Sequence, residues 1–247
     1  MSSRSRRAYD PGAGKAAASV LLSDEESHHL GRVLRLREGD AVSVFDGLGR
    51  EWDGALEGWE GKRARVKLGA EAKDPVESPL TVRLFQGLCR PERMELVIQK
   101  GTEIGVASIH PIVTARSEAS DPSPAKMERW RRMALEACKQ SGRRMIPTFH
   151  EPRGFPPDAP AAGTCAIALH PDDATRPLGE LLVGAPPAEA WLGIGPEGGF
   201  DPDEVETLAK AGWLVASMGP RILRTETAGL VAASIVLHRW ADLGPVR

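Results

Sequence analysis

A glycine-rich segment carries the most specific chemical pattern in the chain. Residues 193–200 read Gly-Ile-Gly-Pro-Glu-Gly-Gly-Phe, after a run typical of a buried strand and before a helix start. The letters match GxGxxG, the dinucleotide-binding fingerprint. Glu197 weakens this interpretation, because a carboxylate repels a pyrophosphate at a helix N-terminus. The expected ribose-binding acid is also absent, since Ser217-Met-Gly219 stands about twenty residues later. A tight structural turn is the alternative interpretation of the same glycines.

A second loop of unusual composition follows the next strand pattern. Residues 218–228 read Met-Gly-Pro-Arg-Ile-Leu-Arg-Thr-Glu-Thr-Ala, which places two arginines and a glutamate at a helix start. A third strand pattern ends at Leu169-His170. Adjacent strand ends form the crevice where α/β proteins bind ligands. A ligand with a positive charge, such as S-adenosylmethionine, tolerates Glu197 where a pyrophosphate does not.

The elements that hold these loops alternate between strand and helix patterns. Asp201-Pro-Asp-Glu204 is a capping box with proline at the first helical position. The predicted strands are 81–88, 106–113, 164–170, 190–195 and 213–218, and the predicted helices are 91–103, 123–142, 201–212 and 225–240. Such alternation predicts a mostly parallel α/β sheet.

The N-terminal part of the chain has a different pattern. Residues 1–15 are predicted to form a flexible arm, and Ser23-Asp-Glu-Glu26 forms a capping box before a short helix. Three alternating strands, 41–45, 51–56 and 64–68, are separated by turns at Asp46-Gly47 and Gly61-Lys62, which predicts a small barrel. The predicted organisation is therefore a domain over 1–73, a linker over 74–79 and an α/β domain over 80–247.

Charge and composition restrict the class of protein. The net charge is -2, but residues 83–153 carry 13 Lys/Arg against 8 Asp/Glu and residues 154–247 carry 6 against 12. A basic middle beside an acidic end favours a polyanion held on one face, and ordinary charge scatter is the alternative. The three cysteines and six histidines have no metal-ligand spacing. No run reads as a signal peptide or membrane span, so we expect a cytoplasmic protein with reduced thiols, no bound metal and no membrane partner.

The two glycine loops together resemble the ribosomal RNA small subunit methyltransferase E family, a branch of the knotted SPOUT methyltransferases. The resemblance covers nearly the whole chain. Besides the two loops, it rests on His29-Leu-Gly-Arg-Val-Leu-Arg35, Gly39-Asp40, Glu95-x-x-Ile-Gln-Lys100, Thr102-Glu-x-Gly-Val106, Pro111, Arg116-Ser117, Glu128-Arg-Trp130, Glu136-Ala137, Gln140-Ser-x-Arg143 and Pro147.

The resemblance implies an α/β catalytic domain of SPOUT type, whose C-terminal segment is threaded through a trefoil knot, and a small N-terminal β-barrel (PUA-like) domain that binds RNA. It implies a homodimer that binds S-adenosylmethionine and methylates N3 of a uridine in 16S ribosomal RNA, near the decoding centre of the small ribosomal subunit. This sequence departs from the family at Arg7-Ala-Tyr9, which lacks an aromatic pair, and at Cys89-Arg-Pro-Glu-Arg93, which is less rich in lysine. These departures concern RNA contacts more than the cofactor site.

The candidate site residues fall into three sets. Arg116, Arg224 and Glu226 are the predicted catalytic residues, because a developing uracil anion needs a cation and a proton acceptor. A structural ion pair between Arg224 and Glu226 is the alternative. The predicted cofactor residues are Leu169, His170, Gly193, Gly195, Pro196, Glu197, Gly198, Met218, Gly219, Ile222, Leu223 and Arg224. The predicted RNA contacts are Arg32, Arg35, Arg90, Arg93, Lys100 and Arg143, for each of which a solvated surface charge is the alternative.

Two other functions remain open at this stage, a nucleotide-dependent oxidoreductase and a non-enzymatic RNA-binding protein. The last helix also predicts an interface between two copies of the chain. Its apolar residues Leu230, Val231, Ile235, Leu237 and Trp240 cover more than one helical face, which a single copy is not expected to bury.

Overall fold

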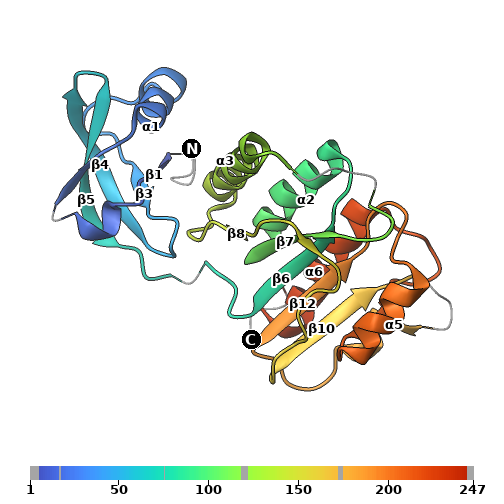
Figure 1. The fold of residues 1–247 in the computed structure, drawn as a ribbon. Helices are drawn as coiled ribbons and strands as arrows, with labels where there is room; N and C mark the ends of the chain where they lie inside the picture. The colour runs from blue at the N-terminus through green and yellow to red at the C-terminus, as the bar shows by residue number, and fades with distance from the viewer. Residues whose placement is uncertain (1–5, 17, 75, 118–121, 172–174, 244–247) are drawn as a thin grey trace. The chain divides into compact units, whose positions relative to one another are not determined.

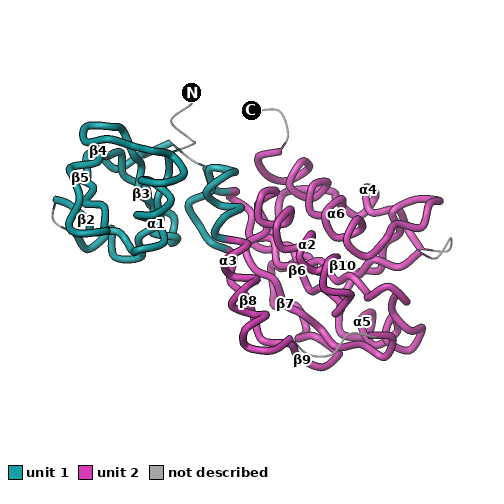
Figure 2. Tube along the Cα trace, turned by 90° about the horizontal axis from the view of Figure 1, so that it is seen from above, with its two compact units in different colours: residues 1–77, 135–146 teal, residues 78–134, 147–247 magenta. Residues whose placement is uncertain are grey.

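The computed structural model describes residues 6–16, 18–74, 76–117, 122–171 and 175–243. The chain forms two compact units (Figures 1 and 2). Unit 1 contains Met1–Glu77 and Leu135–Ile146, and unit 2 contains Ser78–Ala134 and Pro147–Arg247. Within the described residues, no helix is long and apolar enough to cross a membrane.

Unit 1 is built on a five-stranded sheet within the described residues, in the order β1-β3-β4-β5-β2. Strands β1 and β3 are parallel, and the other neighbours are antiparallel. Figure 2 shows β2, β3, β4 and β5 arranged around a ring. The elements are β1 (Arg7–Tyr9), the 3₁₀ turn η2 (Ala13–Lys15), β2 (Ser19–Leu21), α1 (Asp24–His28), the π-helical turn η3 (His29–Val33), β3 (Ser43–Phe45), β4 (Glu51–Glu60) and β5 (Arg63–Glu71).

The three strands predicted from alternation in this unit are confirmed. Their inward residues, among them Val44, Leu56 and Val66, are fully or almost fully buried. Strands β4 and β5 extend beyond the predicted ranges because they continue to the hairpin turn, where Gly61 has a positive φ of 63°.

The prediction of a flexible arm over residues 1–15 is wrong for the part of it that the structure describes from Arg7 onward. Arg7 is only 3% exposed, and β1 pairs with β3 in parallel. Arg7 Nη1 donates to the carbonyl of Cys138 (2.7 Å) and Nη2 donates to that of Arg143 (2.9 Å), while Nε donates to Glu51 (2.8 Å). A distant arginine thus adds donors to carbonyl groups at and just beyond the C-terminal end of a helix, where backbone donors become scarce; the carbonyl of Cys138 also accepts from the amide of Gly142.

The capping box at residues 23–26 forms only in part. Ser23 accepts a hydrogen bond from the amide of Glu26, as predicted. The Glu26 carboxylate instead accepts from the amide of Tyr9 and pairs with the ammonium of Lys139. A buried lysine is a stronger partner for a carboxylate than the exposed start of a five-residue helix.

Unit 2 contains a second sheet, in the order β11-β13-β10-β12-β6-β7-β8, with β9 also paired to β7. All neighbouring strands in its described part run parallel, which confirms the predicted sheet type. Its strands are β6 (Thr81–Gly87), β7 (Ser108–Val113), β8 (Thr148–Phe149), β9 (Arg153–Gly154), β10 (Thr164–Leu169), β11 (Arg176–Pro177), β12 (Glu189–Ile194) and β13 (Leu214–Ser217).

The helices of unit 2 cover both faces of the sheet. Figure 1 shows α5 in front of the sheet and α6 behind it. Side chains alternate accordingly, since Phe85 and Trp191 join the core beneath α5, whereas Leu84 and Ile194 lie beside Gly229 of α6. The helices are α2 (Pro91–Ile104), α3 (Pro124–Ser141), α4 (Leu178–Leu181), α5 (Pro202–Lys210) and α6 (Thr225–Trp240).

Local signals in the sequence predicted the ends of these helices well. Gly105 adopts the left-handed conformation that ends α2, with a φ of 119°. The capping box between Asp201 and Glu204 is complete at the start of α5. Helix α6 has the predicted bounds, although Leu237 is fully buried within its own unit and does not belong to an exposed face.

The end of α3 and the segment after it, residues 135–146, belong to unit 1. Glu51 accepts hydrogen bonds from both Arg7 and Arg144, at 2.8 and 2.9 Å. Glu77 accepts from the side chain of Arg143 and from the amides of Arg144 and Met145. Burial alone would raise the pKa of Glu51, but the hydrogen bonds from Arg7 and Arg144 outweigh it and hold the pKa below its ordinary value.

Candidate functional site

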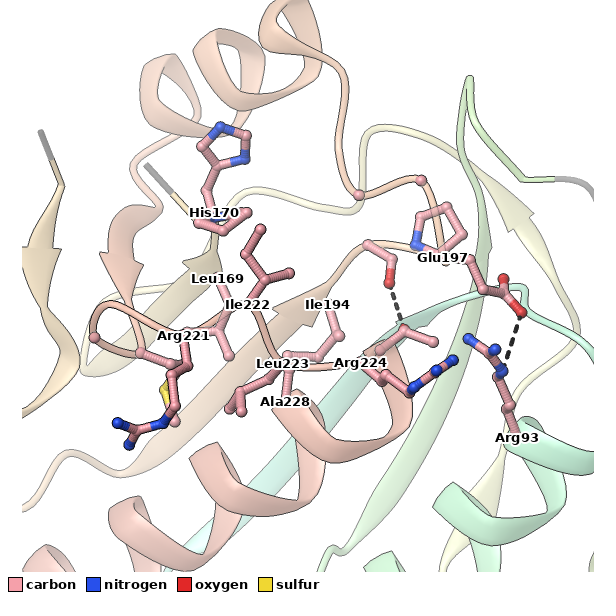
Figure 3. A pocket seen from close by; sticks show the side chains of 18 of the residues that line it. Arg93, Leu169, His170, Ile194, Glu197, Arg221, Ile222, Leu223, Arg224 and Ala228 are labelled. Carbon is pink, nitrogen blue, oxygen red and sulfur yellow. Dashed lines mark hydrogen bonds and ion pairs between the residues drawn. The ribbon is translucent and has the colours of Figure 1, made fainter. Parts of the chain in front are cut away.

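A cavity of about 620 Å³ lies at the carboxyl ends of the parallel strands of unit 2 (Figure 3). The loops after β10, β12 and β13 form it together with the turn between β6 and α2 and the start of α6. This is the edge of an α/β sheet where ligands bind, and the volume is typical of a small-molecule site.

The structure brings almost the whole predicted cofactor set to this cavity. Gly193 is the exception, since it lies one strand position too early and a Cβ built on it would lie 3.1 Å from the ring of Trp213. The predicted residues that line the cavity are Leu169, His170, Gly195, Pro196, Glu197, Gly198, Met218, Gly219, Ile222, Leu223 and Arg224.

Several lining residues were not predicted as cofactor residues. Arg90 comes from the turn between β6 and α2 and Arg93 from the first turn of α2, and both lie at the cavity because β6 is the sheet neighbour of β12. Sequence alone gave no signal for this pairing of distant strands. The other unpredicted residues lie within the predicted loops or directly beside them, so including every residue of those loops and their neighbours would have predicted them. They are Pro171, Ile194, Gly199, Arg221, Thr225 and Ala228.

Glycines in the first loop are required by close backbone packing. A Cβ on Gly195 would lie 2.7 Å from the backbone nitrogen of Phe200, and one on Gly87 would lie 2.4 Å from that of Pro196. Gly199 has a positive φ of 72°. The loop is therefore compact because of its glycines, and its backbone rather than its side chains borders much of the cavity.

Two carboxylates lie around a single arginine at one side of the cavity, and of the two only Glu197 lines the cavity itself. Arg93 lies 3.7 Å from Glu197 and 3.7 Å from Glu226 (the first pair is drawn in Figure 3). The amide of Arg90 donates to Glu197 at 3.0 Å. Burial, followed by the charges of Glu197 and Glu226, raises the pKa of the neighbouring Cys89 thiol to about 12. Cys89 therefore stays a thiol, and the chemistry of the site belongs to its charged residues.

Arg224 differs from Arg93, because its guanidinium has no ion pair or hydrogen bond to another described residue. It is exposed at the cavity, and Figure 3 shows it on the side where Arg93 and Glu197 lie. The structure does not contain the alternative ion pair between Arg224 and Glu226, because Glu226 pairs with Arg93. Arg224 is thus available to a ligand.

Arg116 does not line the cavity but supports its first loop from outside. Its guanidinium donates to the carbonyl of Gly198 at 3.1 Å and to the carboxylate of Asp201 at 3.0 Å. A Cβ on Gly198 would lie 3.1 Å from Cβ of Arg116. These contacts favour a supporting role over direct contact with a reacting group.

The predicted RNA contacts separate into different environments. Arg32 and Arg35 are exposed on unit 1, at and just after the turn η3. Lys100 pairs with Glu103 on the surface of α2. Arg143 is buried and pairs with Glu77, so we withdraw it as a phosphate contact: its charge is already neutralised inside unit 1.

Apolar side chains form the rest of the cavity wall. Leu169 and Ile194 are buried at the strand ends, and Leu223 lies beside Ala228 at the start of α6 (Figure 3). Ile222, in contrast, is 83% exposed at the same cavity. Flat apolar surfaces next to backbone amides suit a ring system with polar edges, such as a purine.

Known protein families match both units. Residues 76–237 match the model of an RNA methyltransferase domain, and residues 22–69 match that of an RNA methyltransferase PUA domain. The fold and the cavity therefore define an RNA methyltransferase with a PUA-like N-terminal domain.

Individual relatives narrow the class to one family. Ribosomal RNA small subunit methyltransferase E of Synechocystis is 35% identical over 87% of this chain and 71% of its own length. The Mycobacterium bovis enzyme of the same name is 33% identical over 90% of this chain and 88% of its length. A crystal structure of the Neisseria gonorrhoeae enzyme of that name, bound to S-adenosyl methionine, has 30% identity and a TM-score of 0.86, covering 96% of this chain and 98% of that one. The chain belongs to the ribosomal RNA small subunit methyltransferase E family.

Proposed function

We propose that this protein methylates N3 of a uridine in 16S ribosomal RNA, near the decoding centre of the small ribosomal subunit. The family fixes the coarser activity, methylation of small-subunit ribosomal RNA with S-adenosylmethionine as donor. The observation that carries the proposal is the cavity at the strand ends, where Arg224, which has no partner among the described residues, lies on the same side as Arg93 and Glu197. The atom and the nucleotide are the finer part of the proposal.

The residues present fit S-adenosylmethionine. Leu169, Ile194, Met218 and Leu223 offer apolar surface to the adenine ring, and the glycine loop around Gly195 offers backbone groups to its polar edges. When bound, the cofactor supplies an electrophilic methyl group on a sulfonium. Glu197 would attract the positive charge of the cofactor, and the four arginines that also line the cavity, Arg90, Arg93, Arg221 and Arg224, suit anionic groups.

The chain's own residues have two chemical tasks at the uracil. N3 carries a proton that must leave before or while the methyl group is transferred from the sulfonium, and loss of this proton places negative charge on the ring carbonyl oxygens until the N–C bond forms. Arg224 would stabilise this charge, because its planar guanidinium stays protonated and spans a carbonyl oxygen. Glu226 would accept the proton or orient Arg93 toward the substrate. Arg116 would act through the loop that it supports.

RNA would reach the cavity with its target base out of the stack, since N3 is hidden in a paired helix. Arg90 and Arg93 line the cavity, where they would contact backbone phosphates of that segment. Arg32 and Arg35, which are exposed, would contact RNA on unit 1. We propose the domain limits predicted from the sequence, 1–73 for the N-terminal domain and 80–247 for the catalytic domain. Residues 135–146 of the second range pack with the N-terminal domain and support it.

We also propose that the C-terminal segment forms the trefoil knot of SPOUT enzymes and that two copies associate through α6. The sheet order supports a complex path, because the chain leaves β12 for β13 beyond β10 and returns as α6 beside β12. Helix α6 has an apolar hollow, which is lined by Leu230, Val231 and Ile235. The side chain of Val231 is exposed there. Light scattering at micromolar protein should give the mass of a dimer, and a monomer would contradict the association.

Nucleoside analysis of ribosomal RNA tests the function in cells. Small-subunit RNA from cells that lack the gene should lose one 3-methyluridine, and a gene copy should restore it. Unchanged methylation would favour a non-enzymatic RNA-binding protein. Binding of NADH rather than S-adenosylmethionine to the pure protein would favour the oxidoreductase alternative.

A further inference from the structure

We infer that Thr225 and Gln86 are positioning residues that fix the glycine loop 195–199 for the methyl donor. The inference rests on the proposed function for its meaning and deepens it, because neither residue belongs to the predicted catalytic set. Both come from elements outside the loop, which is how they can control its position.

The inference begins with a chain of buried hydrogen bonds. Gln86 in β6 is fully buried, and its Nε2 donates to Oγ1 of Thr225 at 2.8 Å and to the carbonyl of Gly87 at 3.2 Å. Oγ1 of Thr225 donates to the carbonyl of Gly195 at 2.6 Å. The carbonyl oxygens of Gly87 and Gly195 can only accept hydrogen bonds. The Thr225 hydroxyl must therefore donate to Gly195, and the Gln86 amide must donate to Gly87 and to Thr225.

This chain joins three segments that are distant in sequence. Gln86 and Thr225 are 139 residues apart, and Thr225 and Gly195 are 30 residues apart. Gln86 is the second-last residue of the neighbouring strand β6, Gly195 begins the loop and Thr225 is the first residue of α6. Thr225 also lines the cavity and adjoins Arg224. One hydroxyl therefore connects the loop at the cofactor site with the helix start that carries the proposed catalytic arginine.

Tight packing around the chain leaves little room for adjustment. Gly87 and Gly195 both lie where a Cβ would meet loop backbone within 2.7 Å. A Cβ on Gly229 of α6 would lie 3.3 Å from Oε1 of Gln86. Gly87 and Gly195 themselves have no side chain to fill a gap that opens here, so the hydrogen bonds to Thr225 and Gln86 help to decide where the Gly195 carbonyl lies.

Loss of the Thr225 hydroxyl should leave two groups without partners in a dry site. The carbonyl of Gly195 would lose its donor, and one of the two N–H groups of the Gln86 amide would lose its acceptor while the other keeps the carbonyl of Gly87, and each loss has a desolvation cost. The loop would relax away from α6 to reach other partners, and the cavity would lose its shape. The cost should therefore appear in cofactor affinity and not only in stability.

The experiment compares Thr225→Val with Thr225→Ser. Valine has the shape of threonine without the hydroxyl, whereas serine keeps the hydroxyl and loses the methyl group. Calorimetric titration with S-adenosylmethionine should show a Kd about 10-fold higher for Thr225→Val, as one buried hydrogen bond predicts. Thr225→Ser should bind within about 2-fold of the original protein. Thr227→Val, two residues along α6 at a side chain without a hydrogen bond among the described residues, is the matched control.

Hydrogen exchange gives a second measurement, made without cofactor. The amides of Gly199 and Phe200 should exchange faster in Thr225→Val than in the original protein, and Thr225→Ser should restore their protection. Gln86→Met should have the same effect as Thr225→Val, and the double variant should be no worse than the stronger single one, because both changes break one chain.

The outcomes separate the inference from the proposed function. If the original protein does not bind S-adenosylmethionine, the proposed function fails. If it binds, and folded Thr225→Val binds equally well with unchanged exchange in the loop, the positioning role is wrong. Equal losses in Thr225→Val and Thr225→Ser would also overturn it, because the hydroxyl would then not be the cause.

Discussion

Arginine has opposite surroundings in the two units. In unit 1, Arg7 and Arg144 are buried on the two oxygens of Glu51, and Arg143 pairs with Glu77. At the cavity of unit 2, the guanidinium groups of Arg221 and Arg224 are exposed and have no partner among the described residues. An arginine that is neutralised inside a unit holds it together, whereas an arginine kept charged and free at a cavity is available to bind an anion.

The units also differ in how they bury ionisable groups. Unit 1 buries them in opposite-charge pairs, such as Arg7 with Glu51 and Lys139 with Glu26. Unit 2 buries His110, which stacks on Phe85 and His150 and whose Nε2 bonds to the Ser108 hydroxyl. Burial, with the charges of His150 and Arg83, lowers the pKa of His110 to about 3, so it is buried as a neutral ring. The comparison predicts different responses to mutation and to pH.

Removal of the carboxylate shared by two arginines should have the largest effect. Glu51→Ala removes the carboxylate that pairs with buried Arg7 and one of the two that pair with Arg144, which keeps Asp74. It should lower the free energy of unfolding of unit 1 by about 3–5 kcal/mol. Urea titration measures this. Glu60→Ala, which breaks a surface pair with Arg65, is the control and should cost at most about 1 kcal/mol. Equal effects in the two variants would remove the distinction between buried and exposed pairs.

Arg224→Ala should have the next largest effect, and only on chemistry. Loss of a donor to a developing oxyanion costs about 10²–10³ in rate. Single-turnover methylation should slow by that factor, while the Tm and the Kd for S-adenosylmethionine change little, because the side chain has no structural partner among the described residues. Normal turnover would exclude Arg224 from catalysis and leave Glu226 and Arg116. A parallel fall in Tm and affinity would mean a structural role.

Arg32→Ala and Arg35→Ala should have a moderate effect on RNA binding. Each loss of a phosphate contact should reduce the dependence of log K on log salt by about 0.7 on single-stranded RNA. A filter-binding series in salt measures the slope. Lys100→Ala is the matched control, because Lys100 already pairs with Glu103. If the Lys100 variant alters the slope as much as the arginine variants do, the absence of an ion pair does not predict which basic side chains contact RNA.

The smallest expected effect is the response of unit 2 to mild acid. The folded pKa of His110 lies near 3 and its unfolded value near 6.5, so below about pH 6.5 the unfolded chain binds a proton that the folded chain does not. Stability should therefore fall as pH drops from 6.5 toward 3. The Tm should be lower at pH 5 than at pH 7.5, and His110→Gln should reduce that difference. The exposed His28→Gln variant should keep it, and an unchanged difference in His110→Gln would refute the assignment.

The sequence predicted best what depends on neighbouring residues. The bounds of α6, the complete capping box of α5 and the left-handed Gly105 follow from local chemistry. The loops at Gly195 and Gly219 were found for the same reason, because glycine, proline and charge at strand ends are legible without a structure. The two-residue strands β8, β9 and β11 were not predicted, since such short segments carry no periodicity.

What depends on distant contacts could not be predicted. Arg7 looked like part of an arm, because its partner carbonyl on Cys138 lies 131 residues away. Arg143 looked like a phosphate contact, because nothing local shows that Glu77 neutralises it. Arg93 was predicted to contact RNA, but its place between Glu197 and Glu226 required the pairing of β6 with β12.

Methylation by the purified protein tests the central claim most directly. The protein is incubated with labelled S-adenosylmethionine and with small-subunit RNA or subunits from cells that lack the gene, and the product nucleoside is identified by mass spectrometry. The account predicts one labelled 3-methyluridine per small-subunit RNA, lost in Arg224→Ala. The account would be contradicted by label on another base or on another atom of uridine. It would also be contradicted if the protein binds the cofactor but transfers no methyl group to any of these substrates.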